Sequence, residues 1–256
     1  MANATERQGK LKYSASEWQS RVDLAACYRL ADMFGFSDII WNHITAKVPG
    51  TETFLINRFG LRHDEITASN LVLLDLDGNV IDPGSARSEF DDVNLTGFII
   101  HSAIHAARPD VSCVLHSHSE YGLAVSALED GLLPLVQDSM PYFEQVAYHD
   151  YEGLSTSLDE RQRLATDLGD KHVMILRNHG LLTCGATVAE AFMLMYYLER
   201  SCKVQIQVMS SGAKYRVVPA DVCHSAASQY VLFPHGKYEW PALLRLLDAR
   251  APDYRD

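Results

Sequence analysis

Polar and apolar positions follow two different periods along this chain. Apolar residues spaced by three and four predict helices, the first opening at Ser16-Glu17 with Ser14 or Ser16 as its cap and ending at Gly35. Further helices are expected at 91–107, at 123–128, after a Ser157 cap and at 187–209. Short apolar runs predict extended segments at 39–41, 44–48, 53–56, 71–75, 80–81, 114–118, 131–136, 173–176 and 181–184.

Two turn signals indicate the kind of sheet that these strands form. Pro49-Gly50 and Asp77-Gly78 each separate two predicted strands by a few residues, which is typical of hairpins. Hairpins make neighbouring strands antiparallel, so a doubly wound parallel sheet is disfavoured. We therefore predict a fold of the α/β (mixed α+β) class, with a central mixed, largely antiparallel sheet flanked by helices.

Length and composition are those of a globular protein with a real core. The 256 residues are 47% apolar and 21% charged, and no long Pro/Gly/Ser linker divides them. We therefore expect a flexible tail at 1–13 followed by a single domain at 14–256. The segment from residue 217 onward is rich in aromatic residues but has little periodicity, so we expect it to pack over a neighbour.

Charge and cysteine usage exclude several classes of partner. A net charge of −11 argues against a nucleic-acid partner, since phosphate binding needs a basic surface. No apolar run is long enough to cross a bilayer, and the first residues lack the apolar core of a signal peptide. The five cysteines are scattered without a paired motif, which suits reduced core thiols and predicts a cytoplasmic protein.

Two histidines end the apolar strand at 114–118. Side chains alternate across a strand, so His116 and His118 point to the same side of the sheet. Two imidazoles on one face of one strand make half of a metal site. A single histidine is more often structural than a ligand, and this spacing alone leaves both interpretations open.

A third histidine follows another short apolar strand. His179 lies beside Gly180 at a strand-turn-strand junction, from which it can project into a shared pocket. Three neutral imidazoles with an open coordination position suit a catalytic Zn²⁺, and they also suit Fe²⁺, Mn²⁺ or Co²⁺.

The order of these landmarks resembles the class II aldolase/adducin family. Three segments carry the resemblance in the right order. They are Trp41-Asn42-His43-Ile44-Thr45, then Ala107-Arg108-Pro109-Asp110 with Val114-Leu115-His116-Ser117-His118, and finally Arg177-Asn178-His179-Gly180-Leu181. The resemblance implies a three-layer αβα domain whose catalytic members have a nine-stranded mixed sheet.

The resemblance also implies a function and an assembly. Catalytic members cleave, epimerise or dehydrate small sugar phosphates on a divalent metal, and they form tetramers with active sites between subunits. It makes His116, His118 and His179 the ligands of one metal per chain, Zn²⁺ in the first place, with Fe²⁺ or Mn²⁺ as alternatives. We further expect Asn42, Thr45 and Gly97 to contact the small-molecule substrate.

Two departures from the family pattern change the expected chemistry. The acid/base Glu of the aldolases falls at Gly97, inside a Leu-Thr-Gly-Phe pattern that looks like the adducin head domain. The Ser-Ser pair that helps hold a substrate phosphate is also missing, so we expect a substrate without phosphate. Glu120 and Tyr148 are the candidate replacement catalytic residues, although each also has an ordinary structural interpretation.

Three hypotheses follow for the function. The first is a metal-dependent carbon–carbon lyase, of aldolase or decarboxylase type, acting on a small hydroxy- or keto-carbonyl compound. The second is a non-haem iron(II) oxygenase or decarboxylase. The third is a non-catalytic, adducin-like scaffold, which would bind no metal tightly.

Overall fold

The computed structural model describes residues 12–84, 93–153 and 158–256. Eight strands in these ranges form one sheet, in the order β4-β3-β2-β1-β5-β8-β7-β6. Only β6 and β7 pair in parallel, and every other neighbouring pair is antiparallel. The bounds are β1 Ile44–Lys47, β2 Thr53–Ile56, β3 Val72–Asp75, β4 Val80–Asp82, β5 Cys113–Ser117, β6 Val146–His149, β7 Val173–Leu176 and β8 Gly180–Gly185. The mixed, largely antiparallel sheet predicted from the hairpin signals is confirmed.

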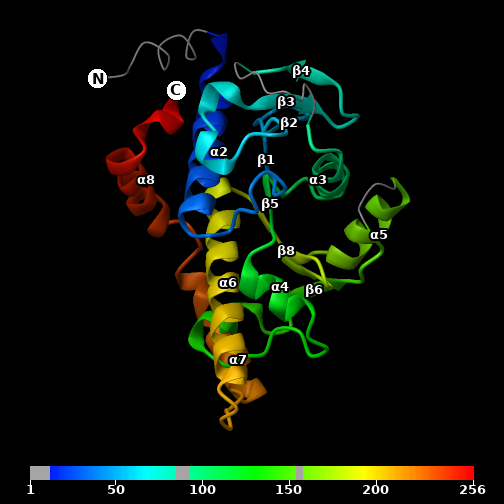
Figure 1. Cartoon of the computed structure of the whole chain (residues 1–256), viewed down its shortest axis with the longest axis vertical. Coiled ribbons are helices and arrows are strands. Elements are labelled where there is room, and N and C mark those ends of the chain that lie inside the picture. Colours follow the sequence, from blue (N-terminus) through cyan, green and yellow to red (C-terminus); the bar gives the residue numbers. More distant parts are fainter. Residues whose placement is uncertain (1–11, 85–92, 154–157) are drawn as a thin grey trace.

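Helices cover both faces of this sheet, as Figure 1 shows. Helices α2 and α6 lie along one face, and α3 and α5 lie on the other. Their bounds are α2 Ala15–Met33, α3 Leu95–Ala107, α4 Glu120–Ser126, α5 Leu158–Leu168, α6 Val188–Ser210, α7 Ala220–Gln229 and α8 Glu239–Arg250, with short 3-10 turns between some of them. The sheet is therefore the middle layer of an αβα arrangement.

Alternation along β5 separates two hydrophobic cores. Cys113 and Leu115 belong to the large core under α2 and α6, whereas Val114 belongs to the smaller core under α3 and α5. Successive side chains of a strand point to opposite faces, so the same rule assigns His116 to the side of Val114. The strand thus carries its histidine toward the α3 layer.

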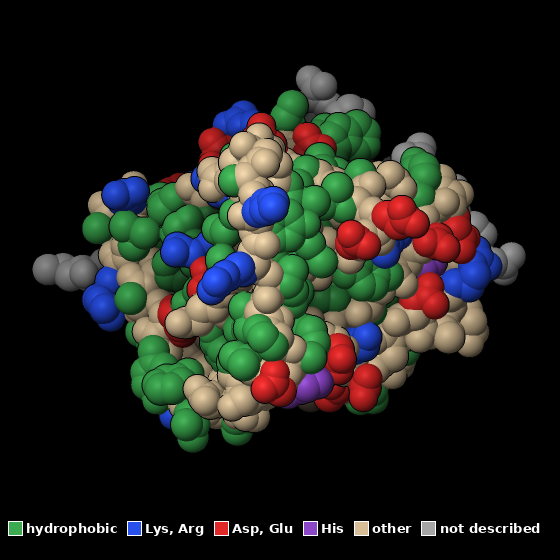
Figure 2. Space-filling view, turned by 90° about the horizontal axis from the view of Figure 1, so that it is seen from below, with side chains coloured by type: hydrophobic (Ala, Val, Ile, Leu, Met, Phe, Trp, Pro, Cys, Tyr) green, Lys and Arg blue, Asp and Glu red, His purple; other side chains and the backbone are tan. Residues whose placement is uncertain are grey.

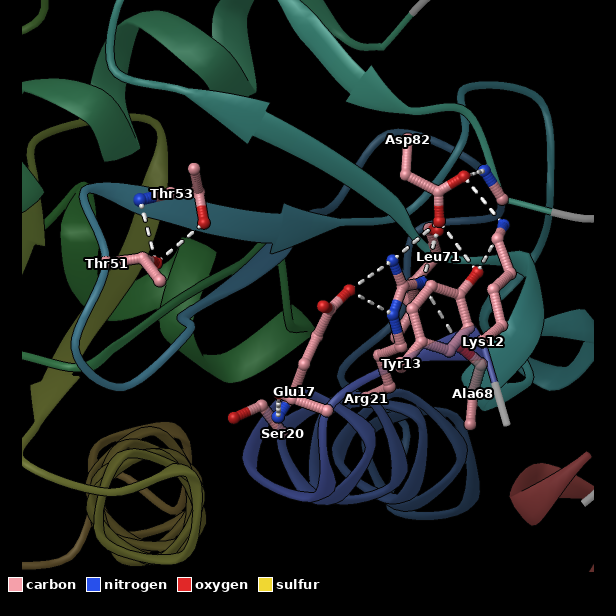
Figure 3. Close-up of polar contacts among 12 residues, drawn as sticks. Lys12, Tyr13, Glu17, Ser20, Arg21, Thr51, Thr53, Ala68, Leu71 and Asp82 are labelled. Atoms are coloured by element: carbon pink, nitrogen blue, oxygen red, sulfur yellow. Dashed lines mark hydrogen bonds and ion pairs between the residues drawn. The ribbon is translucent and has the colours of Figure 1, made fainter. Parts of the chain in front are cut away.

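A buried arginine ties α2 to the sheet. Arg21 is fully buried, and its guanidinium donates to Glu17, to Asp82 at 2.9 Å and to the carbonyls of Ala68 and Leu71 (Figure 3). Its plane also stacks on the Tyr13 ring at 3.9 Å. Because every donor direction has a partner, the buried charge is compensated and α2 is held over the strands.

Two predicted helix starts agree with the structure, and two others differ from it by three or four residues. Helix α2 begins after Ser14, whose hydroxyl accepts from the Glu17 amide, and α6 begins after a Thr187 cap. Helix α3 begins at Leu95 with Asn94 as its cap, four residues later than expected. Helix α4 begins three residues earlier than the predicted segment at 123–128. The predicted Ser157 cap and residues 1–11 of the predicted tail lie outside the described residues.

Two strand predictions were wrong. The apolar run at 39–41 forms a turn, since Ile39 has a positive φ of 50° and exposes its side chain. The segment 131–136 is an irregular loop and adds no strand to the described sheet. The segment after residue 217, for which the sequence predicts no helix, is largely helical, in α7 and α8. Helix α8 packs on α2 of the same chain, and packing of this segment over a neighbour stays a prediction. The expected nine strands are eight in the described part of the chain.

The start of the described chain is bound to the edge of the sheet. Lys12 and Tyr13, the last residues of the predicted tail, both hydrogen-bond Asp82 of β4. All five cysteines are buried and free, as the scattered spacing predicted. No helix in the described ranges combines the length and the apolar character that a bilayer crossing requires.

Candidate metal centre

Three histidines from two parts of the sheet meet at the end of β5. His116 lies in β5 and His118 follows it by two residues, while His179 lies in the turn between β7 and β8. That turn is tight: Asn178 has a φ of 55° and Gly180 a φ of 151°. A Cβ atom on Gly180 would lie 2.4 Å from the Ser117 carbonyl oxygen. Gly180 is therefore required for β8 to approach β5 closely enough to bring His179 to the other two histidines.

The ligand atoms of the three side chains converge. One nitrogen from each of His116, His118 and His179 lies within 4.8 Å of the others. The Nε2 atoms of His116 and His118 are 2.9 Å apart, and the His179 ring centroid is 4.8 and 5.1 Å from those of His116 and His118. Zn–N bonds are about 2.0–2.1 Å long, so one ion fits among three imidazoles at this spacing after small side-chain shifts.

The second nitrogen of two of these histidines is held by the protein. His116 Nδ1 lies 3.0 Å from the carbonyl oxygen of Leu181, to which it donates. His118 Nδ1 lies 3.0 Å from Asp38 Oδ2. Both bonds place the proton on Nδ1 and leave the Nε2 lone pairs facing each other. Metal-binding histidines nearly always carry such a carbonyl or carboxylate partner, so the donor set fits a divalent metal ion.

Burial keeps the imidazoles of His116 and His179 neutral, as a metal ligand must be. Burial, and after it the neighbouring His118 and His149, lower the pKa of His179 to about 4. Burial, and after it the neighbouring His179, hold the pKa of His116 well below its usual value. Neutral imidazoles present a lone pair to an ion without first losing a proton at neutral pH.

The three histidines open into a cavity of about 330 Å³. Its other walls include His43, Thr96 and Ile100, and the aromatic rings of Trp41 and Tyr151. The Tyr151 ring stands edge-on to His179, with centroids 6.3 Å apart. The cavity has room for a small organic molecule beside a bound ion.

A family comparison matches the region that holds this site. The model of the class II aldolase and adducin N-terminal domain matches residues 22–206, which include all three histidines. The chain belongs to the class II aldolase/adducin family. The resemblance predicted from the three sequence segments is therefore confirmed.

Relatives within the family carry the names of both aldolases and adducins. An aldolase class 2 protein of Pseudomonas aeruginosa, so named provisionally, is 47% identical over 94% of both chains. Rat alpha-adducin is 40% identical over 93% of this chain, which spans 34% of the adducin's length. Family membership alone therefore does not decide between an enzyme and a scaffold.

Solved structures share the fold. An aldolase II superfamily protein from Pseudomonas syringae superposes with a TM-score of 0.90 at 47% identity, covering 96% of this chain and 99% of its own. L-fuculose 1-phosphate aldolase from Glaciozyma antarctica superposes with a TM-score of 0.81 at 30% identity, covering 99% and 100%. The predicted class II aldolase-like architecture is confirmed.

The two predicted catalytic residues lie outside the histidine cavity. Glu120 is the exposed first residue of α4 and lines an adjacent cavity of about 500 Å³ that also includes His118. The Tyr148 hydroxyl accepts from the Leu132 amide, and its ring stacks under Arg177. A catalytic role for either residue stays a prediction, and Glu120 is the one that shares a cavity wall with a ligand.

The three predicted substrate-binding residues lie behind the cavity wall. Asn42 is buried, and neither its amide nitrogen nor its oxygen has a hydrogen-bond partner in the described part. The Thr45 hydroxyl lies between His101 Nδ1 and His105 Nε2, at 2.7 and 2.8 Å. Gly97 lies against the ring of His43. Direct substrate contact by these residues stays a prediction, and the free amide of Asn42 agrees best with it.

Sequence reasoning missed several residues of this candidate site. Asp38, the partner of His118, lies in a turn with no motif of its own. Tyr151 and Trp41 line the cavity from loops. His43 lies in a quoted motif, but its neighbours on α3 could not be read from local spacing. The tertiary fold brings each of these residues to the site, and no periodic pattern in the sequence predicts it.

Acid is expected to destabilise the metal-free protein through buried histidines outside the ligand set. Burial lowers the pKa of His63 to about 4 and that of His105 to about 3, against 6.5 in a model peptide. Below pH 6.5 the unfolded chain binds protons that the folded chain excludes, so stability falls with pH down to these lower values. At pH 5 each histidine should cost about 2 kcal/mol.

Urea unfolding with a chelator at pH 7 and pH 5 measures this loss. The variant His63→Phe should show a smaller difference between the two pH values, since one titrating group is gone. Val231→Ala, which shortens an exposed side chain that does not titrate, should leave the difference unchanged. Equal unfolding free energies at both pH values in the wild type would contradict the prediction.

Proposed function

We propose that this protein is a divalent-metal-dependent lyase that breaks a carbon–carbon bond in a small hydroxy- or keto-carbonyl compound. The observation that carries the proposal is that hydrogen bonds from the protein fix the orientation of two of the three histidines. The Leu181 carbonyl and the Asp38 carboxylate orient His116 and His118 with both Nε2 lone pairs turned toward His179. A buried imidazole with a fixed tautomer, such as that of His116, is costly to keep unless it binds something.

The chain's own residues supply orientation and exclusion of water. A divalent metal held by His116, His118 and His179 would polarise the substrate's carbonyl oxygen and stabilise negative charge on it. Trp41 and Tyr151 form apolar walls that position a small substrate and displace solvent from the reacting atoms. Glu120, beside His118 in the adjacent cavity, is our proposed proton-transferring residue, with Tyr148 as the second candidate.

A substrate without phosphate agrees with the lining of the cavity. None of its described lining residues is Lys or Arg. Phosphate groups are usually held by such side chains or by several backbone amides at a helix N-terminus. We therefore propose hydroxy- or keto-acids and simple hydroxy-aldehydes and ketones as the compounds to test.

The experiment that tests the function joins metal content with turnover. Protein loaded separately with Zn²⁺, Mn²⁺ or Fe²⁺ is incubated with a panel of such compounds, and products are followed by mass spectrometry with and without oxygen. Cleavage by the Zn²⁺ or Mn²⁺ form in the absence of oxygen supports the lyase. Turnover that requires Fe²⁺ and consumes oxygen would replace it with the iron oxygenase.

A scaffold is the second candidate, and the adducin relatives favour it. Rat alpha-adducin is similar over nearly the whole of this chain. A scaffold predicts neither tight metal binding nor turnover of any compound in the panel. A metal-free wild type that stays inactive after reconstitution would establish this alternative.

We also propose that the chain assembles as a homotetramer in the cytoplasm, with active sites at subunit interfaces. Figure 2 shows hydrophobic side chains gathered at the end of the molecule where α7 lies. In the C-terminal segment Val231, Leu232 and Phe233 expose 81%, 70% and 63% of their surface. Contiguous apolar surface is typical of a protein interface, and buried free thiols suit a reducing compartment.

Replacing Leu232 and Phe233 together with Asp is expected to dissociate the tetramer. Light scattering should give the wild type about four times the chain mass of 28.6 kDa and the variant a smaller mass, because two charges would have to be buried. The control is Val80→Asp/Ile81→Asp, which changes two similarly exposed residues on β4. A variant that keeps the wild-type mass would contradict this interface.

A further inference from the structure

The cavity beside the candidate metal centre is lined by apolar, aromatic and imidazole side chains. Its volume is about 330 Å³, and none of its described lining residues is Asp, Glu, Lys or Arg. Besides the histidines, its walls include Ile100, which is 1% exposed, and the rings of Trp41 and Tyr151. Such walls have no side chain that could pair with a charged substituent of a ligand, so a charge placed there away from the metal centre would be costly.

A second cavity next to it has the opposite character. This cavity of about 500 Å³ is lined by charged residues, among them Arg200 and Lys203, and it shares only His118 with the first. All three candidate ligand histidines line the uncharged cavity, whereas one of them lines the charged cavity. A molecule bound to an ion among the three imidazoles therefore has most of its remaining atoms in the uncharged cavity.

Two large aromatic rings of the uncharged cavity stay about half exposed. Trp41 precedes β1 and Tyr151 follows β6, so two separate loops bring them to one cavity. Trp41 exposes 53% of its surface and Tyr151 exposes 54%. The other two tryptophans of the chain, Trp18 and Trp240, expose only 4% and 8%. Exposed apolar surface that gathers at a concave site is typical of ligand binding, whereas a single exposed apolar residue is not.

Neighbouring rings hold these two side chains in place. Trp41 packs on Phe59 with ring centroids 5.6 Å apart, and Tyr151 stands edge-on to His179 with centroids 6.3 Å apart. Each contact limits the rotation of a ring before a ligand arrives. A ring that is already ordered loses less conformational entropy on binding than a freely rotating one. Both rings are therefore ready to receive apolar surface close to the histidines.

These observations favour a substrate that is polar at one end and apolar at the other. We propose that the substrate is a hydroxy- or keto-carbonyl compound with an apolar side group of about phenyl size, which Trp41 and Tyr151 contact while its oxygens lie at the metal centre. A sugar-like chain of hydroxyl groups would instead place polar atoms against these rings without hydrogen-bond partners. The inference deepens the proposed function and rests on it.

The contribution of the side group can be measured with two hydroxamates. Acetohydroxamate and benzohydroxamate bind a metal through the same two oxygens, but the first carries a methyl group and the second a phenyl group. Their dissociation constants are read from the visible spectrum of Co²⁺-loaded protein. Benzohydroxamate should bind roughly ten- to hundredfold more tightly, because the cavity removes its larger apolar surface from water.

Two variants test whether the named rings cause this preference. In Trp41→Ala/Tyr151→Ala the ratio of the two dissociation constants should fall roughly tenfold, because the phenyl group loses its apolar contacts. The Co²⁺ content of this variant should stay at the wild-type level, since all three histidines remain. Tyr215→Ala removes a ring that is 44% exposed and lies outside the cavity, so it should keep the wild-type ratio.

Contact with Trp41 can also be followed by fluorescence of the Zn²⁺-loaded protein. Trp41 is the exposed one among the three tryptophans, so its emission should shift to shorter wavelength when benzohydroxamate displaces water from the indole. Trp41→Phe keeps an apolar ring but removes the reporter. This variant should still bind benzohydroxamate, and the shift in emission should disappear. Unchanged wild-type emission at saturating benzohydroxamate would contradict the contact.

Separate outcomes distinguish the inference from the function on which it rests. A wild type that takes up no Co²⁺ would overturn the proposed function and this inference together. Normal Co²⁺ uptake with equal dissociation constants for the two hydroxamates would overturn the inference alone, and this is the result expected if a neighbouring subunit already fills the cavity. So would a preference for the phenyl group that survives unchanged in Trp41→Ala/Tyr151→Ala.

Discussion

Replacing both His116 and His118 with Ala will abolish stoichiometric metal binding. Two of three converging ligands disappear, and the remaining His179 has no other side chain in the described ligand group to complete a site. The affinity should fall by more than about a thousandfold, since loss of a single outer partner of a ligand already costs about ten- to hundredfold. Elemental analysis of protein purified without chelator, followed by titration with Zn²⁺, measures the effect.

Two further variants make this test specific. Asp38→Asn keeps all three ligands but weakens the acceptor behind His118, so it should bind metal about ten- to hundredfold more weakly. His224→Ala removes an exposed histidine paired with Glu144 and should bind metal like the wild type. Equal metal content in the wild type and the double variant would show that the ion binds elsewhere.

Replacing Arg21 with Met will destabilise the fold by about 3–5 kcal/mol. The methionine fills much of the same space, but the carbonyls of Ala68 and Leu71 lose their donor inside the protein. Asp82 also loses a buried partner. Urea unfolding monitored by circular dichroism gives the free energy of unfolding.

Lys12→Ala is the matched control for this network. Lys12 also pairs with Asp82, at 2.9 Å, but its side chain is 57% exposed. Exposed ion pairs contribute at most about 1 kcal/mol, so this variant should stay close to the wild type. Similar unfolding free energies for Arg21→Met and the wild type would show that the buried arginine does not hold α2 in place.

Local sequence patterns correctly predicted those helices and strands for which the capping or turn residues agree with the spacing of the apolar residues. The Ser14 cap, the hairpin at Pro49-Gly50 and the Thr187 start of α6 depend on neighbours within a few residues. The segment at 39–41 misled the same reasoning. Its apolar side chains do not enter a sheet, because Ile39 adopts a left-handed turn and Trp41 lines the cavity.

The C-terminal helices were missed for a related reason. Helix α7 buries only Cys223, and α8 buries only Trp240 and Leu247. A helix that buries so few side chains lacks the broad apolar stripe by which helices are recognised in a sequence. The exposed apolar residues Val231, Leu232 and Phe233 lie between these two helices, and in the proposed tetramer they contact another subunit.

The sequence by itself determined the residue types of the candidate metal centre, the common face of His116 and His118, the hairpins and the family. These properties depend on residue chemistry and on alternation over a few positions. Only the tertiary structure decided which distant residues meet. Asp38 reaches His118 across 80 positions, and His43 reaches His101 across 58. Such contacts depend on strand order and register in the sheet, and no local period in a sequence encodes them.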